Sequence, residues 1–159
     1  MVQWAGLIEP GATVLDVAAG SGRHTYFFAD RGHKVTAVDR DVGRLGPAVN
    51  VEIVQADLEG DGCWPFGERR FGAVVVTNYL HRPLIQRLLD AVAAGGVLLY
   101  ETFMVGNERF GRPSRPEHLL RDGELLDCVR GRFSVTAYEA RPISMPQMAM
   151  VQRIAARRF

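Results

Sequence analysis

The sequence has little cysteine, no long apolar run and almost no net charge, and each shortage excludes a class of protein. Its 159 residues include only two cysteines, Cys63 and Cys128, which are far apart and in no metal-ligand spacing. A disulfide framework or a metal cluster is therefore not expected. The longest apolar stretches have the length of a strand, and no basic segment precedes an apolar run at the N-terminus. We therefore expect a cytoplasmic protein with no membrane span and no secretion signal.

The charge balance also limits the partners. The formal net charge is +1, so the overall basic field that draws proteins onto nucleic acids or acidic membranes is missing. The length and the ordinary mixture of apolar and charged residues fit a single domain over residues 1–159. Two local arginine clusters stand out, and each is either a solvated surface or an anion site: Arg109, Arg112 and Arg115 in one loop, and Arg153, Arg157 and Arg158 near the C-terminus.

What the sequence does contain is an alternation of strand and helix patterns. Apolar and β-branched runs predict strands at residues 13–17, 34–38, 51–55, 71–77 and 97–102, with helices at 22–31, 41–48 and 83–93 between them. This alternation favours a parallel sheet covered on both faces. After a loop at 103–115 and a helix at 116–129 that Asp122-Gly123 can interrupt, residues 133–140 and 148–156 predict an antiparallel hairpin. We therefore expect a doubly wound, seven-stranded α/β mixed sheet, mostly parallel.

The turn after the first predicted strand has the features of a ligand site. It contains small residues at alternate positions, Ala18, Gly20 and Gly22, which let a ligand approach the backbone, and the next helix offers free N–H groups. Ligands of such sheets bind at the carboxyl ends of the strands. There, Asp39 can accept ribose hydroxyls and Asp57 an adenine amino group. Small residues also serve merely to pack a helix on a sheet, but three such features on successive strands predict an adenosine-type ligand.

A dinucleotide is the weaker choice for this ligand. Its fingerprint needs a small residue three positions after the second glycine, and counting from Ala18 and Gly20 that position is the bulky Arg23. A chain of this length also lacks room for the catalytic domain that a dehydrogenase usually adds. A nicotinamide cofactor is therefore the less favoured alternative.

These residues resemble those of the class I methyltransferases that use S-adenosylmethionine (SAM), over nearly the whole chain. Their glycine motif matches Asp16-x-Ala18-x-Gly20-x-Gly22, with alanine at the first glycine. The chain looks most like small domains related to tellurite-resistance and type-12 methyltransferases. The resemblance implies a Rossmann-like fold, SAM as cofactor and S-adenosylhomocysteine as product. It implies that the cofactor is bound by Asp16, Ala18, Ala19, Gly20, Ser21, Gly22, Arg23, Asp39, Arg40, Asp57, Leu58 and Asn78.

The loop after the fourth predicted strand, residues 78–82, supplies the catalytic candidates. The resemblance places Asn78 at the methionine end of SAM, and Tyr79 can form a wall of the methyl site. His81 is the candidate general base, because imidazole titrates near neutral pH; the alternative is a histidine at a helix start that bonds backbone. Pro83 comes too late for the Asn/Asp-Pro-Pro-aromatic motif of enzymes that methylate DNA amino groups. His24, near the start of the first predicted helix, can face the pocket, but we assign it no role.

The acceptor candidates are less definite. Glu101, at the end of the fifth strand, either orients an acceptor amine or pairs with an arginine. The loop at 103–115 is a candidate lid, in which Arg109, Arg112 and Arg115 either bind an anionic acceptor or form a surface stiffened by prolines. We expect a small-molecule acceptor. An RNA acceptor and a non-catalytic SAM-binding domain are the alternatives, and both the acceptor atom and the oligomeric state stay open.

Overall fold

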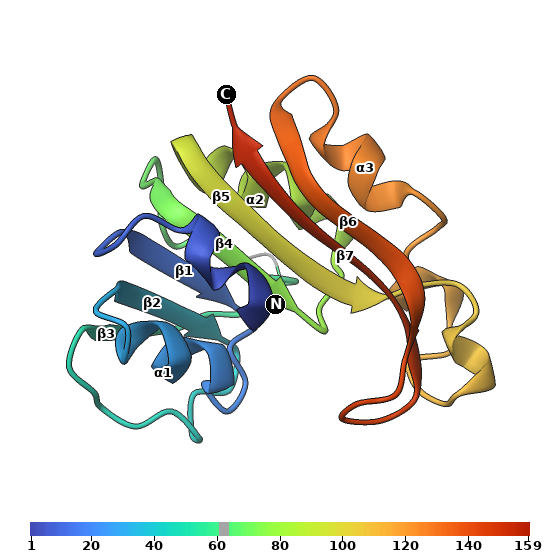
Figure 1. Cartoon of the computed structure of the whole chain (residues 1–159). Coiled ribbons are helices and arrows are strands. Elements are labelled where there is room, and N and C mark those ends of the chain that lie inside the picture. Colours follow the sequence, from blue (N-terminus) through green and yellow to red (C-terminus); the bar gives the residue numbers. More distant parts are fainter. Residues whose placement is uncertain (61–63) are drawn as a thin grey trace.

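The computed structural model describes residues 1–60 and 64–159, and its centre is a twisted seven-stranded sheet (Figure 1). The strand order is β3-β2-β1-β4-β5-β7-β6. The strands are β1 (Thr13–Val17), β2 (Lys34–Asp39), β3 (Val51–Gln55), β4 (Phe71–Thr77), β5 (Val92–Phe103), β6 (Phe133–Ile143) and β7 (Ala149–Arg158). Cys63 lies outside the described residues. The predicted fold class is confirmed.

Strand pairing decides which ends of the strands meet. β1 pairs in parallel with β2 and β4, β2 with β3, and β4 with β5. β7 runs antiparallel to both β5 and β6. The carboxyl ends of the first five strands therefore share one edge of the sheet, and the long β6–β7 hairpin extends past that edge (Figure 1).

Helices cover the sheet on both faces. α1 (Arg23–Ala29) and the 3-10 helix η1 (Val2–Leu7) pack on one face, where Phe28 is fully buried. The other face is covered by η2 (Arg82–Leu84), α2 (Ile85–Ala91) and α3 (Glu124–Val129). Two further 3-10 turns, η3 (Asn107–Arg109) and η4 (Pro116–His118), lie between β5 and α3.

The central strand β4 shows why its residues form a buried strand. Ala73 and Val75 pack on the α1 side, whereas Val74 and Val76 pack on the α2 side, and all four are fully buried. Side chains alternate between the faces of a strand, so a continuous apolar run fits a sheet covered on both sides. Each fully buried valine contributes about 1.5–3 kcal/mol through the hydrophobic effect.

The helix predicted over residues 41–48 is wrong, since this segment is turn and coil. The Asp41 side chain accepts a hydrogen bond from the Gly43 backbone N–H at 3.0 Å, which offers the backbone an alternative to the helix. Gly46 then bonds the Tyr26 hydroxyl through both its N–H and its carbonyl, and Pro47 follows. These tertiary bonds hold the segment against α1.

Other boundaries moved for local reasons. The helix predicted over 116–129 is split into η4 and α3, because Leu119 is extended and Leu120 pairs with Met104 after β5; Gly123, with a left-handed φ of 70°, then precedes α3. α2 ends at Ala91, since Val92 is already extended, and β5 begins there. In the described parts of the chain, no helix combines the length and apolar character needed to cross a bilayer.

Candidate functional site

The two glycines of the turn after β1 have different roles. Gly22 has a φ of +79°, and a Cβ built on it would lie 2.5 Å from Tyr26 Cε2 and 2.7 Å from Leu45 Cδ2. Gly20 has a φ of +59°, but a Cβ there would meet nothing within 4 Å. Gly22 is thus needed for packing, whereas the space beside Gly20 is free for a ligand. Ala18 also takes a left-handed φ, of 53°, which costs an alanine about 1 kcal/mol.

The carboxylate of Asp39 is fixed beside this turn. Its Oδ2 accepts a hydrogen bond from the Gly20 backbone N–H at 2.8 Å, and its Oδ1 accepts one from the Asp41 N–H at 2.9 Å. A carboxylate oxygen has two lone pairs, so each oxygen can accept one further bond. The side chain is therefore preorganised to accept two hydroxyl groups of a sugar.

A pocket of about 240 Å³ adjoins this carboxylate, and we call it the Asp39 pocket. Its lining residues are Ala18, Asp39, Arg40, Ala56, Asp57, Leu58, Glu59 and Tyr79. The alanines and Leu58 give it apolar sides that suit a flat ring. Asp57 is held by a 2.9 Å hydrogen bond from the Glu59 N–H to its Oδ1. Its other carboxylate oxygen, Oδ2, can accept a hydrogen bond from an amino group.

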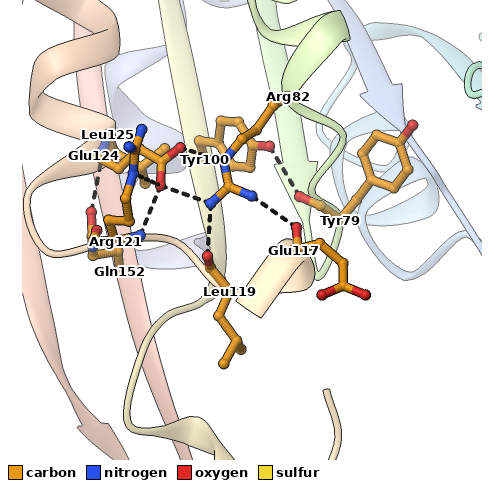
Figure 2. A network of polar contacts seen from close by, with 9 residues as sticks. All are labelled: Tyr79, Arg82, Tyr100, Glu117, Leu119, Arg121, Glu124, Leu125 and Gln152. Carbon is orange, nitrogen blue, oxygen red and sulfur yellow. Dashed lines mark hydrogen bonds and ion pairs between the residues drawn. The ribbon is translucent and has the colours of Figure 1, made fainter. Parts of the chain in front are cut away.

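Tyr79 belongs to this pocket, where Figure 2 shows its ring turned away from its own carbonyl. That carbonyl accepts a 3.0 Å hydrogen bond from the Tyr100 hydroxyl. Burial, followed by the nearby Glu59, Asp57 and Asp39 carboxylates, raises the pKa of Tyr79. Its hydroxyl is therefore protonated at neutral pH, and its ring closes one side of the Asp39 pocket.

A second pocket, of about 340 Å³, lies on the other side of the end of β4, and we call it the Glu101 pocket. Asn78 lines it, while the next residue, Tyr79, lines the Asp39 pocket, so consecutive residues after β4 contribute to the walls of both pockets. Asn78 has a φ of 54°, and its N–H bonds the Glu101 carbonyl at 2.9 Å. The pocket is lined by Met1, Val2, Arg23, His24, Asn78, Glu101, Phe103, Ile143, Met145, Pro146, Gln147, Ala149, Val151 and Arg153.

The two ionisable side chains near the start of α1 have shifted pKa values. Asp16 is buried and accepts a 2.6 Å hydrogen bond from the Thr25 hydroxyl; burial raises its pKa to about 6. His24 is buried with Nδ1 3.2 Å from Thr77 Oγ1. Burial, reinforced by Arg23, lowers its pKa to about 4, so its imidazole is neutral at pH 7. The position of His24 in the Glu101 pocket depends on the packing of α1 against β4, which the sequence does not reveal.

Glu101 pairs with an arginine, which was one of its two predicted roles. The Nε of Arg153 lies 2.7 Å from Glu101 Oε2, and the two side chains are only 12% and 15% exposed. Arg153 Nη1 is also 3.5 Å from Glu139 Oε2. The two residues face each other because β7 pairs with β5 in that register. Only strand pairing between distant segments could reveal Arg153 as part of the site.

Three further predicted residues lie outside both pockets. His81 is half-buried and lines a separate hollow with Trp64, Pro83 and Arg87. Arg112 and Arg115 are exposed, and the nearest carboxylate to Arg115 is that of Glu117, at 3.9 Å. The structure therefore does not bring these three side chains to the Glu101 pocket.

Arg109 lies on the other face of the β6–β7 hairpin. It lines a hollow with Pro142 and Met150, whereas their neighbours Ile143 and Val151 line the Glu101 pocket. Since side chains alternate along a strand, these two sets point in opposite directions. The loop at 103–115 is anchored by buried Asn107, which bonds the Pro113 carbonyl and the Met150 N–H.

The basic C-terminal cluster is largely engaged inside the protein. Arg157 donates to the carbonyls of Gly95 and Leu7, at 2.7 and 2.8 Å. Arg158 donates to three carbonyls around the end of α2, those of Leu89, Asp90 and Val92. These guanidinium groups cap backbone carbonyls.

Neither pocket has the donor set of a metal centre. Among the described residues, no group of three or more histidine, cysteine, aspartate or glutamate side chains is placed to hold a metal ion. The site is built from a glycine turn, a fixed carboxylate at the end of β2 and two adjoining pockets at the carboxyl edge of the sheet. This arrangement defines a class of protein, the α/β proteins that bind a nucleoside cofactor at that edge.

The comparisons with known proteins identify the family within that class. The family described as "Methyltransferase domain" matches residues 14–96, which are 83 of the 159 residues, and the chain belongs to this family. A demethylmenaquinone methyltransferase from Renibacterium salmoninarum is 30% identical over 133 residues. That match covers 79% of this chain and 54% of the relative, so the chain spans about half of the relative's length.

Solved structures confirm the fold. TehB from Haemophilus influenzae superposes with a TM-score of 0.80 at 17% identity, covering 99% of this chain and 61% of that one. A Burkholderia thailandensis 1,6-didemethyltoxoflavin-N1-methyltransferase, with its acceptor and S-adenosylhomocysteine bound, gives a TM-score of 0.67 at 23% identity. That match covers 99% of this chain and 75% of the other. The seven-stranded methyltransferase fold is therefore shared by proteins of low sequence identity.

Proposed function

We propose that residues 1–159 form one SAM-dependent methyltransferase domain that acts on a small molecule. The observation that carries the proposal is the Asp39 carboxylate, held by two backbone N–H groups beside a glycine turn with open space above it. A carboxylate fixed in this way accepts the two hydroxyl groups of a ribose. Membership in the methyltransferase domain family supports SAM as the molecule that carries this ribose.

Each of the two pockets would hold a different part of the cofactor. The Asp39 pocket would hold the adenosine, with the ribose on Asp39 and the adenine amino group toward Asp57. Arg23 and Asn78, which line the Glu101 pocket, would hold the methionine end. The ionised carboxylate of Asp16 lies beneath the turn and favours the positive charge of the cofactor. The other residues predicted for cofactor binding, Ala19, Ser21, Arg40 and Leu58, surround the same turn and pocket.

For methyl transfer, the main task of the protein is to align the acceptor atom with the methyl group of SAM. SAM supplies a methyl group on a positively charged sulfur, which leaves with the electron pair of the broken C–S bond as S-adenosylhomocysteine. The chain has to hold the acceptor atom in line with that bond and exclude water. The Glu101 pocket adjoins the Asp39 pocket at residues 78 and 79, so an acceptor bound there would lie beside the methyl group.

A small-molecule acceptor suits this site better than RNA. The demethylmenaquinone and didemethyltoxoflavin methyltransferases are both named for small acceptors, and the Glu101 pocket has the volume of a small-molecule site. The case for RNA depended on the arginine loop and the basic C-terminus. Arg157 and Arg158 are engaged with backbone carbonyls, and Arg109 faces away from the site.

Calorimetric titration with SAM and with S-adenosylhomocysteine tests the proposal. We expect saturable binding of both at submillimolar concentrations, and slow methyl transfer to at least one member of a panel of small acceptors. Absence of SAM binding would reject the proposal. Tight binding with no turnover on any acceptor of the panel would instead support a non-catalytic SAM-binding domain.

A further inference from the structure

We propose that the acceptor is an uncharged molecule with an apolar ring and a hydrogen-bond donor, which the β6–β7 connection holds against Glu101. This inference rests on the proposed function, because it names the class of substrate that the same site receives. It departs from the anionic acceptor that the arginine loop suggested.

The wall of the Glu101 pocket is mainly apolar where the hairpin covers it. The connection and its flanks contribute Ile143, Met145, Pro146, Gln147 and Ala149, and the paired strands β5 and β7 add Phe103 and Val151. Met145 lines the pocket and is 77% exposed, so its side chain is free to pack against a bound molecule. Methionine is flexible and polarisable, so it adapts to the face of a ring.

The pairing of β6 with β7 separates this wall from the arginine loop. Ala149, Val151 and Arg153 alternate along β7 and all line the Glu101 pocket. Met150, between them, points to the opposite face and contacts the hollow that contains Arg109. The acceptor therefore faces two apolar side chains of β7 and one charged one, Arg153.

The charges at this end of the pocket are already compensated. Arg153 is shared between Glu101 and Glu139, and the amino group of Met1 lies 4.0 Å from the same Glu101 oxygen, Oε2. Arg23 belongs to the methionine end of the cofactor, whose carboxylate would neutralise it. An anionic acceptor would have to displace Glu101 from Arg153 or lie against its carboxylate, and both cost free energy.

The polar groups that remain suit a neutral donor. A hydroxyl or ring N–H of the acceptor can donate to the Glu101 carboxylate. His24 lines the same pocket, and because its Nδ1 is close to the Thr77 hydroxyl, Nε2 is the nitrogen left for a ligand. Its lowered pKa keeps the ring uncharged at pH 7, so His24 offers an anion no charge.

Two probes with the same ring and different charge test the inference. Naphthol is neutral at pH 7 and carries a hydroxyl, whereas naphthoate carries a carboxylate. With the protein saturated with S-adenosylhomocysteine, we expect calorimetry to show saturable binding of naphthol, and binding of naphthoate at least tenfold weaker. Equal or tighter binding of naphthoate, or of sodium selenite, would overturn the inference, as would no binding of naphthol.

Two methionines in the same connection provide a matched pair of variants. Met145 lines the pocket, whereas Met148 is also exposed, at 53%, but is not among the lining residues. We expect Met145→Asp to weaken naphthol binding at least tenfold, and Met148→Asp and Arg109→Ala to change it less than twofold. Equal effects of the two methionine variants would contradict the assigned wall.

A variant of Glu101 tests the role of its charge. Glu101→Gln removes the carboxylate that opposes an anion, so we expect the naphthol preference over naphthoate to fall at least fivefold; an unchanged preference would contradict the argument. Binding of S-adenosylhomocysteine is measured on every variant. A wild-type protein that does not bind it refutes the proposed function, whereas normal cofactor binding without naphthol binding refutes only the acceptor class.

Discussion

The guanidinium group of Arg82 grips the carboxylate of Glu124 with two hydrogen bonds, from Nε to Oε1 at 2.7 Å and from Nη2 to Oε2 at 3.0 Å (Figure 2). The same guanidinium donates to the carbonyls of Glu117 and Leu119. Arg82 ends the loop that carries Asn78 and Tyr79 into the two pockets. This pair therefore connects the carboxyl edge of the sheet to α3, a segment distant in the sequence.

Breaking this pair should destabilise the fold measurably. Burial acts to raise the pKa of Glu124, but hydrogen bonds from Arg82 and from the Arg121 N–H outweigh it and lower the pKa to about 2. A lowered pKa means that the stabilisation is present above the ordinary value of 4.5 and is lost as the pH falls through about 2. We expect Glu124→Gln to lower the free energy of unfolding by about 3 kcal/mol at pH 7, measured by urea denaturation.

The control for this variant is the exposed pair of Asp127 with Arg130. Asp127→Asn should cost less than about 0.5 kcal/mol, because solvent screens an exposed ion pair. If the two variants lose the same stability, Glu124 does not have the anchoring role assigned here.

Asp16 should show the opposite pH dependence. Burial raises its pKa from 3.8 to about 6, so the carboxyl group favours the folded state when protonated, and this contribution is lost as the pH rises from about 4 through 6. Asp16→Asn cannot ionise, and its amide oxygen can still accept the Thr25 hydroxyl bond. We expect the variant to be more stable than the wild type by about 3 kcal/mol at pH 8 and equal to it at pH 4.

Thermal or urea unfolding at the two pH values measures this difference. We also expect Asp16→Asn to bind SAM more weakly, since the lost charge no longer favours the cationic cofactor. A variant less stable than the wild type at pH 8 would show that the Asp16 carboxylate is not disfavoured by its burial.

The two glycines of the turn should separate stability from binding. Gly22→Ala combines a left-handed φ with close contacts to Tyr26 and Leu45, so we expect a loss of about 2–3 kcal/mol in unfolding free energy. Gly20→Ala meets no neighbour and should cost about 1 kcal/mol. Its methyl group enters the space left for the cofactor, so we expect SAM affinity to fall at least tenfold. Unchanged affinity in a folded Gly20→Ala protein would place the cofactor elsewhere.

Asp39→Ala should weaken SAM binding by tenfold or more, because the charge-assisted hydrogen bonds to the ribose are lost. The measurement is calorimetry, with circular dichroism to confirm the fold, since Gly20 and Asp41 lose an acceptor as well. Asp30→Ala, at the exposed end of α1, is the matched control and should keep the affinity. Equal affinities of the two variants would remove Asp39 from the ribose site.

The sequence predicted which residues lie at the carboxyl ends of the first three strands, and the structure places them along one edge of the sheet, but the positions of His81 and Arg109 were not predictable from the sequence. Asp16, Asp39, Asp57 and the glycine turn follow strands whose apolar runs are local in the sequence, so their common edge follows from the winding of the sheet. The expected positions of His81 and Arg109 depended on loops, whose direction is set by distant contacts. Two such contacts are the paired hydrogen bonds from Arg82 to Glu124 and the hydrogen bonds of Asn107 with Pro113 and Met150.

The sequence by itself determined the order of strands and helices along the chain, the turn that needs glycine and the carboxylates at the strand ends. The periodicity of apolar residues and the steric limits of the backbone, on which these features depend, are properties of neighbouring residues. The tertiary structure alone decided that Arg153 faces Glu101 and that His24 lines the same pocket. It also decided that the β6–β7 connection forms one wall of this pocket. Each of these depends on strand register or packing between segments many residues apart. Such register is fixed by which faces are buried once the whole sheet has assembled.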